Sequence, residues 1–138
     1  MTIKSSESGT TLRNRLIRSI VLAIRTLMQQ GSPDAKSLDL AAYIVLALEE
    51  INKTIDTAAT AWEKRDYWVK ADQFRREWAW IEGSHTRLKA AVLSQNWSQI
   101  AIEAVQMGQR FSSTKITEKN RIGEPWLGAW KALKQSIS

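Results

Sequence analysis

Hydrophobic residues recur every three or four positions along most of the chain, the spacing that places them on one face of an α-helix. The first such segment follows Thr10 or Thr11 as a cap and carries them at Leu12, Leu16, Ile20, Ala23 and Leu27. The second begins near Ser37 and carries them at Leu40, Ile44, Leu48, Ile51, Ile55, Ala58 and Trp62. Because Gly31 and Pro33 separate the two segments, the pattern predicts two antiparallel helices joined by a short turn.

The third segment has a strict heptad spacing of apolar and aromatic positions: Tyr67, Ala71, Phe74, Trp78, Ile81, His85, Leu88 and Val92. The phase of this repeat passes through Gly83 without a slip. Two separate helices have no reason to share one phase, so the spacing predicts a single long helix from about 64 to 94. Gly83 is the expected position of a kink.

The remaining sequence predicts two more helices and a loop. Asn96 is a suitable cap for a helix that carries Trp97 and Ile100 on its inner face, and residues 112–124 form a basic loop. Pro125 suits the first position of a last helix through Gln135. We therefore expect an all-α bundle of four or five helices with 64–94 as its long central helix. Residues 1–11 are expected to be a flexible N-terminal tail, and residues 12–138 one helical-bundle domain.

Composition indicates a small basic binding protein. Lys and Arg number 20 against 14 Asp and Glu in 138 residues, which gives a net charge of +6. A basic balance favours an anionic partner, such as nucleic acid or a membrane surface. The chain has no cysteine, which excludes disulfides and thiolate metal sites. Its longest apolar run, residues 41–48, is far shorter than the ~20 residues of a membrane span, so we expect a cytoplasmic protein without membrane insertion.

Residues suited to catalysis are scarce. His85 is the only histidine, and with Glu82 it forms half of the Glu-x-x-His pattern of carboxylate-bridged metal sites. The second half is missing, and His85 lies on the apolar stripe, so a packed, hydrogen-bonded histidine is the preferred interpretation. No glycine-rich phosphate loop or nucleophile motif is present. We expect no enzyme activity, no metal and no cofactor.

The positive charge is concentrated at the two ends of the chain. Residues 1–33 carry a net charge of +4 and residues 83–138 carry +5, around an acidic middle of −3. On the first helix Arg15, Arg18 and Arg25 lie within about 80° of one another, a strip suited to phosphate contact. The alternative is a solvated outer face. The full set of candidate nucleic-acid contacts is Arg13, Arg15, Arg18, Arg25, Arg87, Lys89, Arg110, Lys115, Lys119 and Arg121.

Aromatic and basic residues alternate in 62–70 and again in 75–80. Such interleaving supports base stacking and cation–π contacts with single strands. Trp78 lies on the heptad stripe and is expected in the core. Trp68 and Trp80 lie off the stripe, so each either packs on another helix or faces a partner, with packing preferred.

Residues 40–51 (LAAYIVLALEEI) and 61–75 (AWEKRDYWVKADQFR) resemble the C-terminal helical region of the type I-D CRISPR large subunit. That region is also made separately as the small subunit of the Cascade effector complex. The resemblance extends from about residue 12 to the end. It implies a non-catalytic subunit, present in several copies beside other subunits, that lines the channel for the guide RNA–target DNA duplex and steadies the displaced DNA strand. The family supplies no catalytic residue to carry over.

The sequence thus favours a nucleic-acid-binding subunit of a larger antiviral ribonucleoprotein that makes sequence-independent phosphate contacts. One alternative is a helical adaptor or assembly factor that binds only protein, with its seven tryptophans, unusually many for 138 residues, serving the interface. A second is a peripheral membrane protein whose first helix turns its Leu/Ile face toward lipid.

Overall fold

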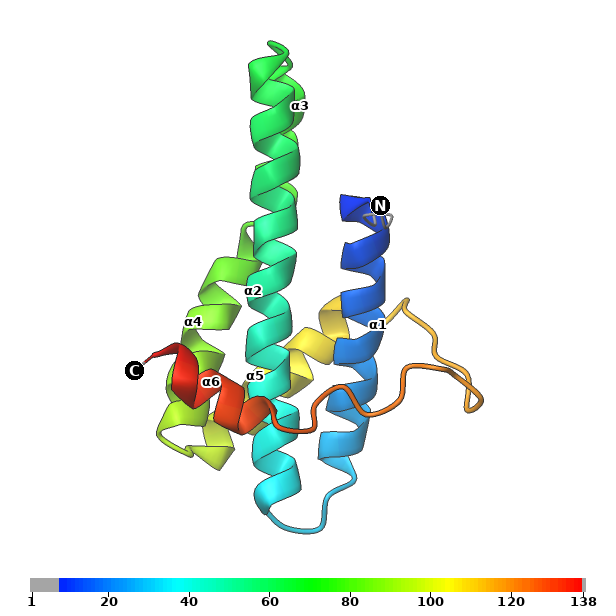
Figure 1. Ribbon diagram of the computed structural model, residues 1–138, viewed down its shortest axis with the longest axis vertical. Helices are drawn as coiled ribbons and strands as arrows, with labels where there is room; N and C mark the ends of the chain where they lie inside the picture. The colour runs from blue at the N-terminus through cyan, green and yellow to red at the C-terminus, as the bar shows by residue number, and fades with distance from the viewer. Residues whose placement is uncertain (1–7, 138) are drawn as a thin grey trace, which may run out of the picture.

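Six helices account for most of residues 8–137, the part of the chain that this computed structural model describes, and no strand occurs within it (Figure 1). They are α1 (Gly9–Met28), α2 (Ala35–Lys64), α3 (Trp68–Glu77), α4 (Trp80–Leu93), α5 (Trp97–Arg110) and α6 (Ala129–Ser136). The predicted all-α bundle is confirmed: five helices have ten residues or more, and α6 has eight.

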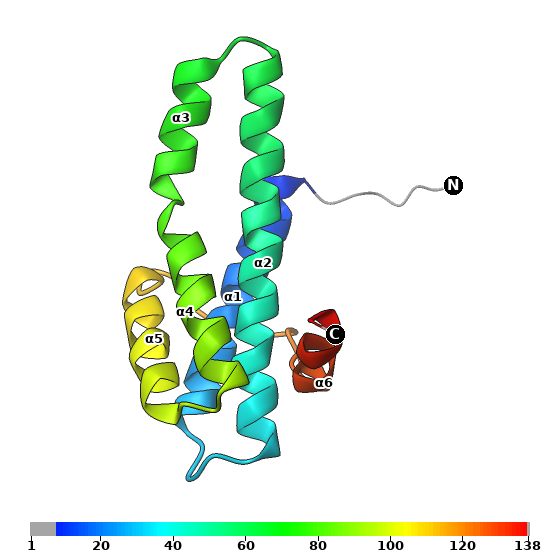
Figure 2. The same ribbon diagram turned by 90° about the vertical axis from the view of Figure 1, so that its left-hand side faces the viewer.

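The long central helix is α2, with 30 residues. The other helices except α5 pack directly along it, as the two views at right angles show (Figures 1 and 2). Leu40, Ala41, Ala42, Ile44 and Val45 are all buried, so this part of α2 is covered on several sides rather than on one stripe. The small alanines let neighbouring helices approach closely, and their methyl groups lose little side-chain entropy on burial.

The prediction of a single helix over 64–94 is wrong. This segment forms α3 and α4, with the break at Trp78–Ala79 and not at Gly83. At the break the amide of Ala79 donates to the carbonyl of Arg76 at 3.3 Å, and the amide of Ile81 donates to the carbonyl of Trp78 at 3.1 Å. Both bonds span three residues, so this is a tightened turn of the 3₁₀ type. Because this turn neither adds nor removes a residue, the heptad phase continues across it. A continuous phase therefore does not prove a continuous helix.

The first helix begins earlier than predicted, at Gly9. The Ser8 side chain accepts a hydrogen bond from the Thr11 amide at 3.0 Å and so caps the helix. Residues 9–11 are therefore helical rather than part of a tail, and residues 1–7 lie outside the described residues. The predicted cap at Asn96 is confirmed, since its side chain accepts from the amide of Gln99.

The apolar face of α1 is buried against α2 and is closed to lipid. Leu16 is 7% exposed and Ile20 is fully buried. A lipid-facing role for this face, one of the alternatives from the sequence, is inconsistent with the structure.

A pair of hydrogen bonds from α2 fixes the start of α6. The Asp39 carboxylate accepts from the amides of Gly128 at 3.2 Å and Trp130 at 2.9 Å. Gly128 has a φ of 81°, a backbone conformation open to glycine but strained for most other residues. The helix therefore begins at Ala129 instead of Pro125, because its capping group comes from another helix and not from the local sequence.

Replacing Asp39 tests this long-range cap. Asp39→Ala should lower the free energy of unfolding by about 1–2 kcal/mol, the usual worth of a lost N-cap. Asp39→Asn should lower the free energy of unfolding by less, because the side-chain amide oxygen still accepts one hydrogen bond. Urea denaturation of the two variants measures both effects, and equal stability of Asp39→Ala and the parent would show that Asp39 does not hold α6.

Candidate nucleic-acid interface

A groove of about 570 Å³ runs between α1 and the loop that joins α5 to α6. Figure 1 shows this loop, residues 111–128, passing beside α1. The groove brings together the two basic groups that the sequence places about a hundred residues apart. Its lining residues are Arg15, Arg18, Ser19, Tyr43, Thr117, Lys119, Asn120, Arg121, Ile122 and Pro125. We call this the basic groove.

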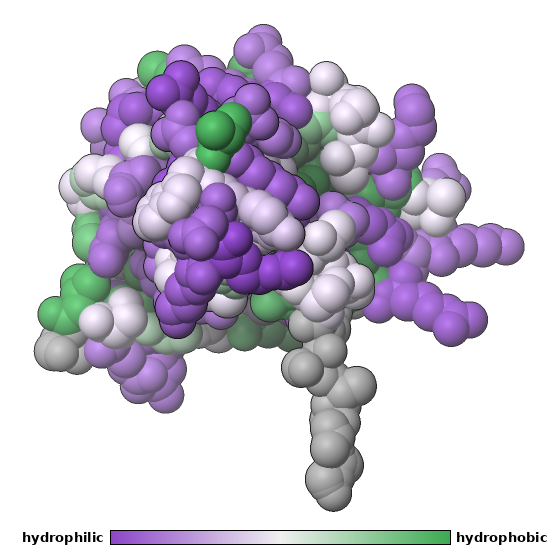
Figure 3. All heavy atoms as spheres, turned by 90° about the horizontal axis from the view of Figure 1, so that it is seen from above, coloured by the Kyte–Doolittle hydropathy of each residue, from purple (hydrophilic) through white to green (hydrophobic). Residues whose placement is uncertain are grey.

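Four cations and no carboxylate line the basic groove in the part of the chain that the structure describes. Arg18, Lys119 and Arg121 are exposed and form no ion pair within residues 8–137, where other side chains make the ion pairs. Glu118 and Glu124 lie in the same loop but outside the lining. Seen from above, hydrophilic side chains project from the side of the molecule that carries α1 and the loop (Figure 3). Arg18, Lys119 and Arg121 therefore concentrate positive charge in the groove, with no carboxylate among its described lining residues.

The floor of the groove joins α1 to α2. The Ser19 hydroxyl donates to the carbonyl of Leu16 at 2.7 Å, and its oxygen lies 2.7 Å from the hydroxyl of Tyr43. Because Ser19 uses its only proton on Leu16, Tyr43 is the donor in the second bond. Both hydroxyl protons are thus used inside the protein, so an anion in the groove would contact the cations at its rim rather than this floor.

The loop that carries Lys119 and Arg121 is anchored at both ends and in the middle. Phe111, Ile116 and Trp126 are buried at 7%, 9% and 3% exposure. Between them the Asn120 side chain donates to the carbonyl of Thr117 at 2.9 Å and accepts from the amide of Ile122 at 3.0 Å. This Asx-type turn closes the loop locally, so the two cations are presented on a supported backbone.

Arg25 and Lys115 are exposed but do not line the basic groove. Arg25 lies on α1 two turns beyond Arg18, and Lys115 precedes the groove-lining part of the loop. Both remain candidate contacts for a backbone that continues past the groove.

Arg13 has a different place from the one the sequence suggested. It is only 7% exposed, and its guanidinium donates to the Thr54 hydroxyl of α2 at 3.1 Å. The same group lies over the rings of Phe74 at 5.1 Å and Trp78 at 5.6 Å. Burial lowers the pKa of Arg13, and the nearby carboxylate of Glu77 partly offsets this effect. Arg13 therefore holds α1 against α2 and α3, and we remove it from the candidate nucleic-acid contacts. The sequence could not separate it from Arg15 because both are arginines in one helix.

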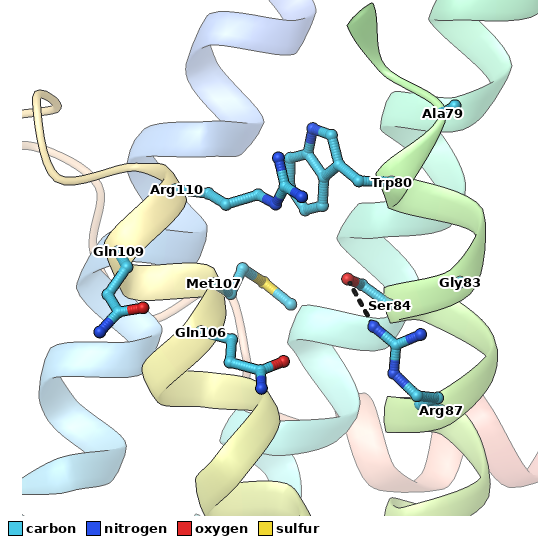
Figure 4. Close-up of a pocket in the computed structure, with 9 residues that line it drawn as sticks. All are labelled: Ala79, Trp80, Gly83, Ser84, Arg87, Gln106, Met107, Gln109 and Arg110. Carbon is cyan, nitrogen blue, oxygen red and sulfur yellow. Dashed lines mark hydrogen bonds between the residues drawn. The ribbon is translucent and has the colours of Figure 1, made fainter. Parts of the chain in front are cut away.

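Arg87 and Arg110 line a second groove of about 630 Å³ between α4 and α5, which Figure 4 shows in close-up. The Arg87 guanidinium is bound to the buried carboxylate of Glu103 at 2.9 Å, and Arg110 lies over the ring of Trp80 at 4.6 Å. On the opposite face of α4, Lys89 lies 4.0 Å from Glu49. Arg87 and Lys89 thus have carboxylate neighbours, so this region offers less uncompensated charge than the basic groove.

His85 is half-buried, and its Nε2 atom lies 2.8 Å from a carboxylate oxygen of Glu49. This contact joins α4 to α2, as expected for a packed, hydrogen-bonded histidine. Within residues 8–137 no three or more His, Asp or Glu side chains are grouped in a way that could hold a metal ion.

The two tryptophans that the sequence left open have different surroundings. Trp80 is half-buried and makes an edge contact with Phe111 at 5.4 Å as well as the contact with Arg110. Trp68 is 60% exposed at the start of α3. The preference for packing is therefore confirmed for Trp80 and is wrong for Trp68, which is a surface residue because its side chain lies mostly outside the contact between α3 and its main neighbour, α2.

Comparisons with known proteins matched no protein-family model, no curated protein and no solved structure. Among the helices of residues 8–137, none combines the length and apolar character needed to cross a membrane.

Two arginines of α1, Arg13 and Arg18, test the division between structural and surface cations. Arg13→Ala should lower the free energy of unfolding by about 1–3 kcal/mol, because it removes a buried hydrogen bond and the packing of the side chain. Arg18→Ala should change it by no more than about 0.5 kcal/mol. Urea denaturation of the two variants is the measurement, and equal stability losses would contradict the assignment.

Proposed function

We propose that the protein is a non-catalytic subunit that binds the sugar–phosphate backbone of nucleic acid in the basic groove. The observation that carries this proposal is the meeting of three exposed cations, Arg18, Lys119 and Arg121, in one groove, where they make no ion pair within residues 8–137. The guanidinium fork matches phosphate oxygens, and no carboxylate among the described lining residues would repel an incoming phosphate.

The contents of the groove favour binding that does not depend on base sequence. Reading a base edge requires a donor and an acceptor held at fixed positions, as an asparagine or glutamine provides. Asn120 is the only such amide among the lining residues that the structure describes, and its side chain donates and accepts within the loop. The cations of the groove contact phosphate, which is present in nucleic acid of every base sequence.

The resemblance to the Cascade small subunit supports a more specific form of the proposal. On this view the protein contacts DNA and guide RNA in the cytoplasm as one of several copies beside other subunits. In RNA-guided complexes base pairing reads the sequence, so a subunit along the duplex needs only backbone contacts. A groove without a base-reading set is consistent with that division of labour.

A protein-only adaptor is the second candidate function. On α5 the side chains of Ile102 and Val105 are 48% and 47% exposed, and their spacing of three places them on one side of the helix. Apolar side chains exposed together favour a protein interface. An adaptor of this kind would assemble with its partner without bound nucleic acid and with little dependence on salt.

Salt dependence of DNA binding tests the groove. In an Arg18→Ala/Lys119→Ala/Arg121→Ala variant, the slope of the log binding constant against log salt concentration should become shallower by about two to three units. Each phosphate contact that is lost means that about one fewer counterion is released from the DNA on binding. This decrease in slope should be the same for nucleic acids of unrelated base sequence. Fluorescence anisotropy with labelled DNA and RNA at several salt concentrations measures it.

A matched variant separates local binding from total charge. Lys36→Ala/Lys131→Ala/Lys134→Ala removes three exposed cations that lie outside the groove and changes the net charge by the same amount. This variant should keep most of the parent slope. Equal losses in the two variants would show that overall charge, and not the groove, is responsible. Full binding by the groove variant would reject the proposal.

A further inference from the structure

The turn between α2 and α3 exposes three large apolar side chains in succession. Tyr67, Trp68 and Val69 are 48%, 60% and 72% exposed. They belong to residues 64–70, which we call the hairpin tip. The tip stands beyond the N-terminal end of α1 (Figures 1 and 2), and the view from above looks onto it (Figure 3). Exposed apolar residues gathered at one end of a molecule mark an interaction site.

The hairpin tip is rigidly supported. The amide of Tyr67 bonds the carbonyl of Trp62 at 2.9 Å, and Asp66 closes the turn with a φ of 64°. Below the turn Arg75 of α3 binds two carboxylates of α2, those of Asp56 at 2.9 Å and Glu63 at 3.2 Å. A ligand that contacts the tip therefore meets side chains whose backbone is already ordered, which reduces the entropy lost on binding.

Trp68 is the tryptophan of the hairpin tip, and it is 60% exposed. The neighbouring rings are already covered, Tyr67 by the Arg65 guanidinium at 5.1 Å and Trp62 by the Lys70 ammonium at 4.6 Å. Within residues 8–137 no ring and no cation is stacked on Trp68. A flat, open indole is the surface on which a nucleobase stacks.

The charges around this ring favour a phosphate-bearing partner. Lys64, Arg65 and Lys70 are exposed in the tip, against one acid, Asp66. The carboxylates that flank the tip in the sequence already form ion pairs. Glu63 pairs with Arg75, and Asp72 pairs with Arg76 at 2.9 Å. The tip therefore combines an open aromatic ring with a net positive charge, which complements an anionic chain that carries aromatic bases.

We propose that Trp68 stacks on an unpaired base of single-stranded nucleic acid while the cations of the hairpin tip contact the adjoining phosphates. This inference rests on the proposed function, since it assigns the protein a second contact with the same class of partner. The strand must be single because the bases of a duplex already stack on one another and leave no free face. The basic groove, by contrast, needs only phosphates.

Stacking is tested with oligonucleotides that contain 2-aminopurine, whose fluorescence falls when it stacks on an aromatic ring. The parent protein should quench this fluorescence, Trp68→Ala should abolish the quenching, and Trp68→Phe should retain part of it. Single-strand affinity of Trp68→Ala should fall by about 5- to 100-fold, the effect of losing one base–aromatic stack. Leu127→Ala, which removes another exposed apolar side chain at 67% exposure, should bind and quench as the parent does.

An oligonucleotide of abasic sites separates this inference from the groove proposal, because it keeps the phosphates and lacks the bases. Trp68→Ala should bind it as tightly as the parent does, whereas the groove variant should bind it more weakly. If the parent binds normal strands with the expected salt slope but quenches no 2-aminopurine, the stacking inference fails and the groove proposal stands. If the parent binds no nucleic acid, the proposed function fails. Concentration-dependent self-association that Trp68→Ala abolishes, without any quenching, would identify the tip as a protein contact and overturn the inference.

Discussion

The burial of α2 along most of its length is the constraint on which the other elements depend. Because its apolar positions are covered from several sides, only a few polar side chains on it can face a neighbour, and each contacts a different part of the molecule. Asp39 caps α6, Tyr43 bonds α1, Glu49 contacts α4, Thr54 receives Arg13 of α1, and Asp56 binds α3. The apolar contacts supply the free energy of packing, and these directional bonds fix where each neighbour begins or how it is rotated.

The same arrangement creates the basic groove. The cap at Asp39 holds the far end of the loop that joins α5 to α6, and the Ser19–Tyr43 bond sets the position of the neighbouring part of α1. Cations from the two ends of the chain are thereby held beside one another, and no carboxylate is among the described residues that line the groove. Like charges held together repel, so an anionic ligand would relieve the repulsion between them.

Arginines in this protein show how position decides role. Arg13 and Arg18 lie five residues apart on α1, yet the first is buried against two aromatic rings and the second is exposed in the basic groove. Arg75 holds the hairpin together and Arg87 neutralises a buried glutamate. The planar guanidinium suits all four settings because it can stack, donate several hydrogen bonds and carry charge in the same place. A count of basic residues therefore overstates the number available to a partner.

The sequence by itself determined the helical class, the apolar faces and the cap at Asn96, because these follow from local periodicity and from a side chain that bonds its own helix. It also identified the two basic segments, the first helix and the loop at 112–124, whose cations line the groove. It could not locate the break at Trp78, since a tightened turn leaves the heptad phase unchanged, nor the start of α6, whose cap comes from Asp39. The burial of Arg13 and the exposure of Trp68 were likewise decided only in the tertiary structure. Each depends on which element packs against the residue, and that contact is made between positions far apart in the chain.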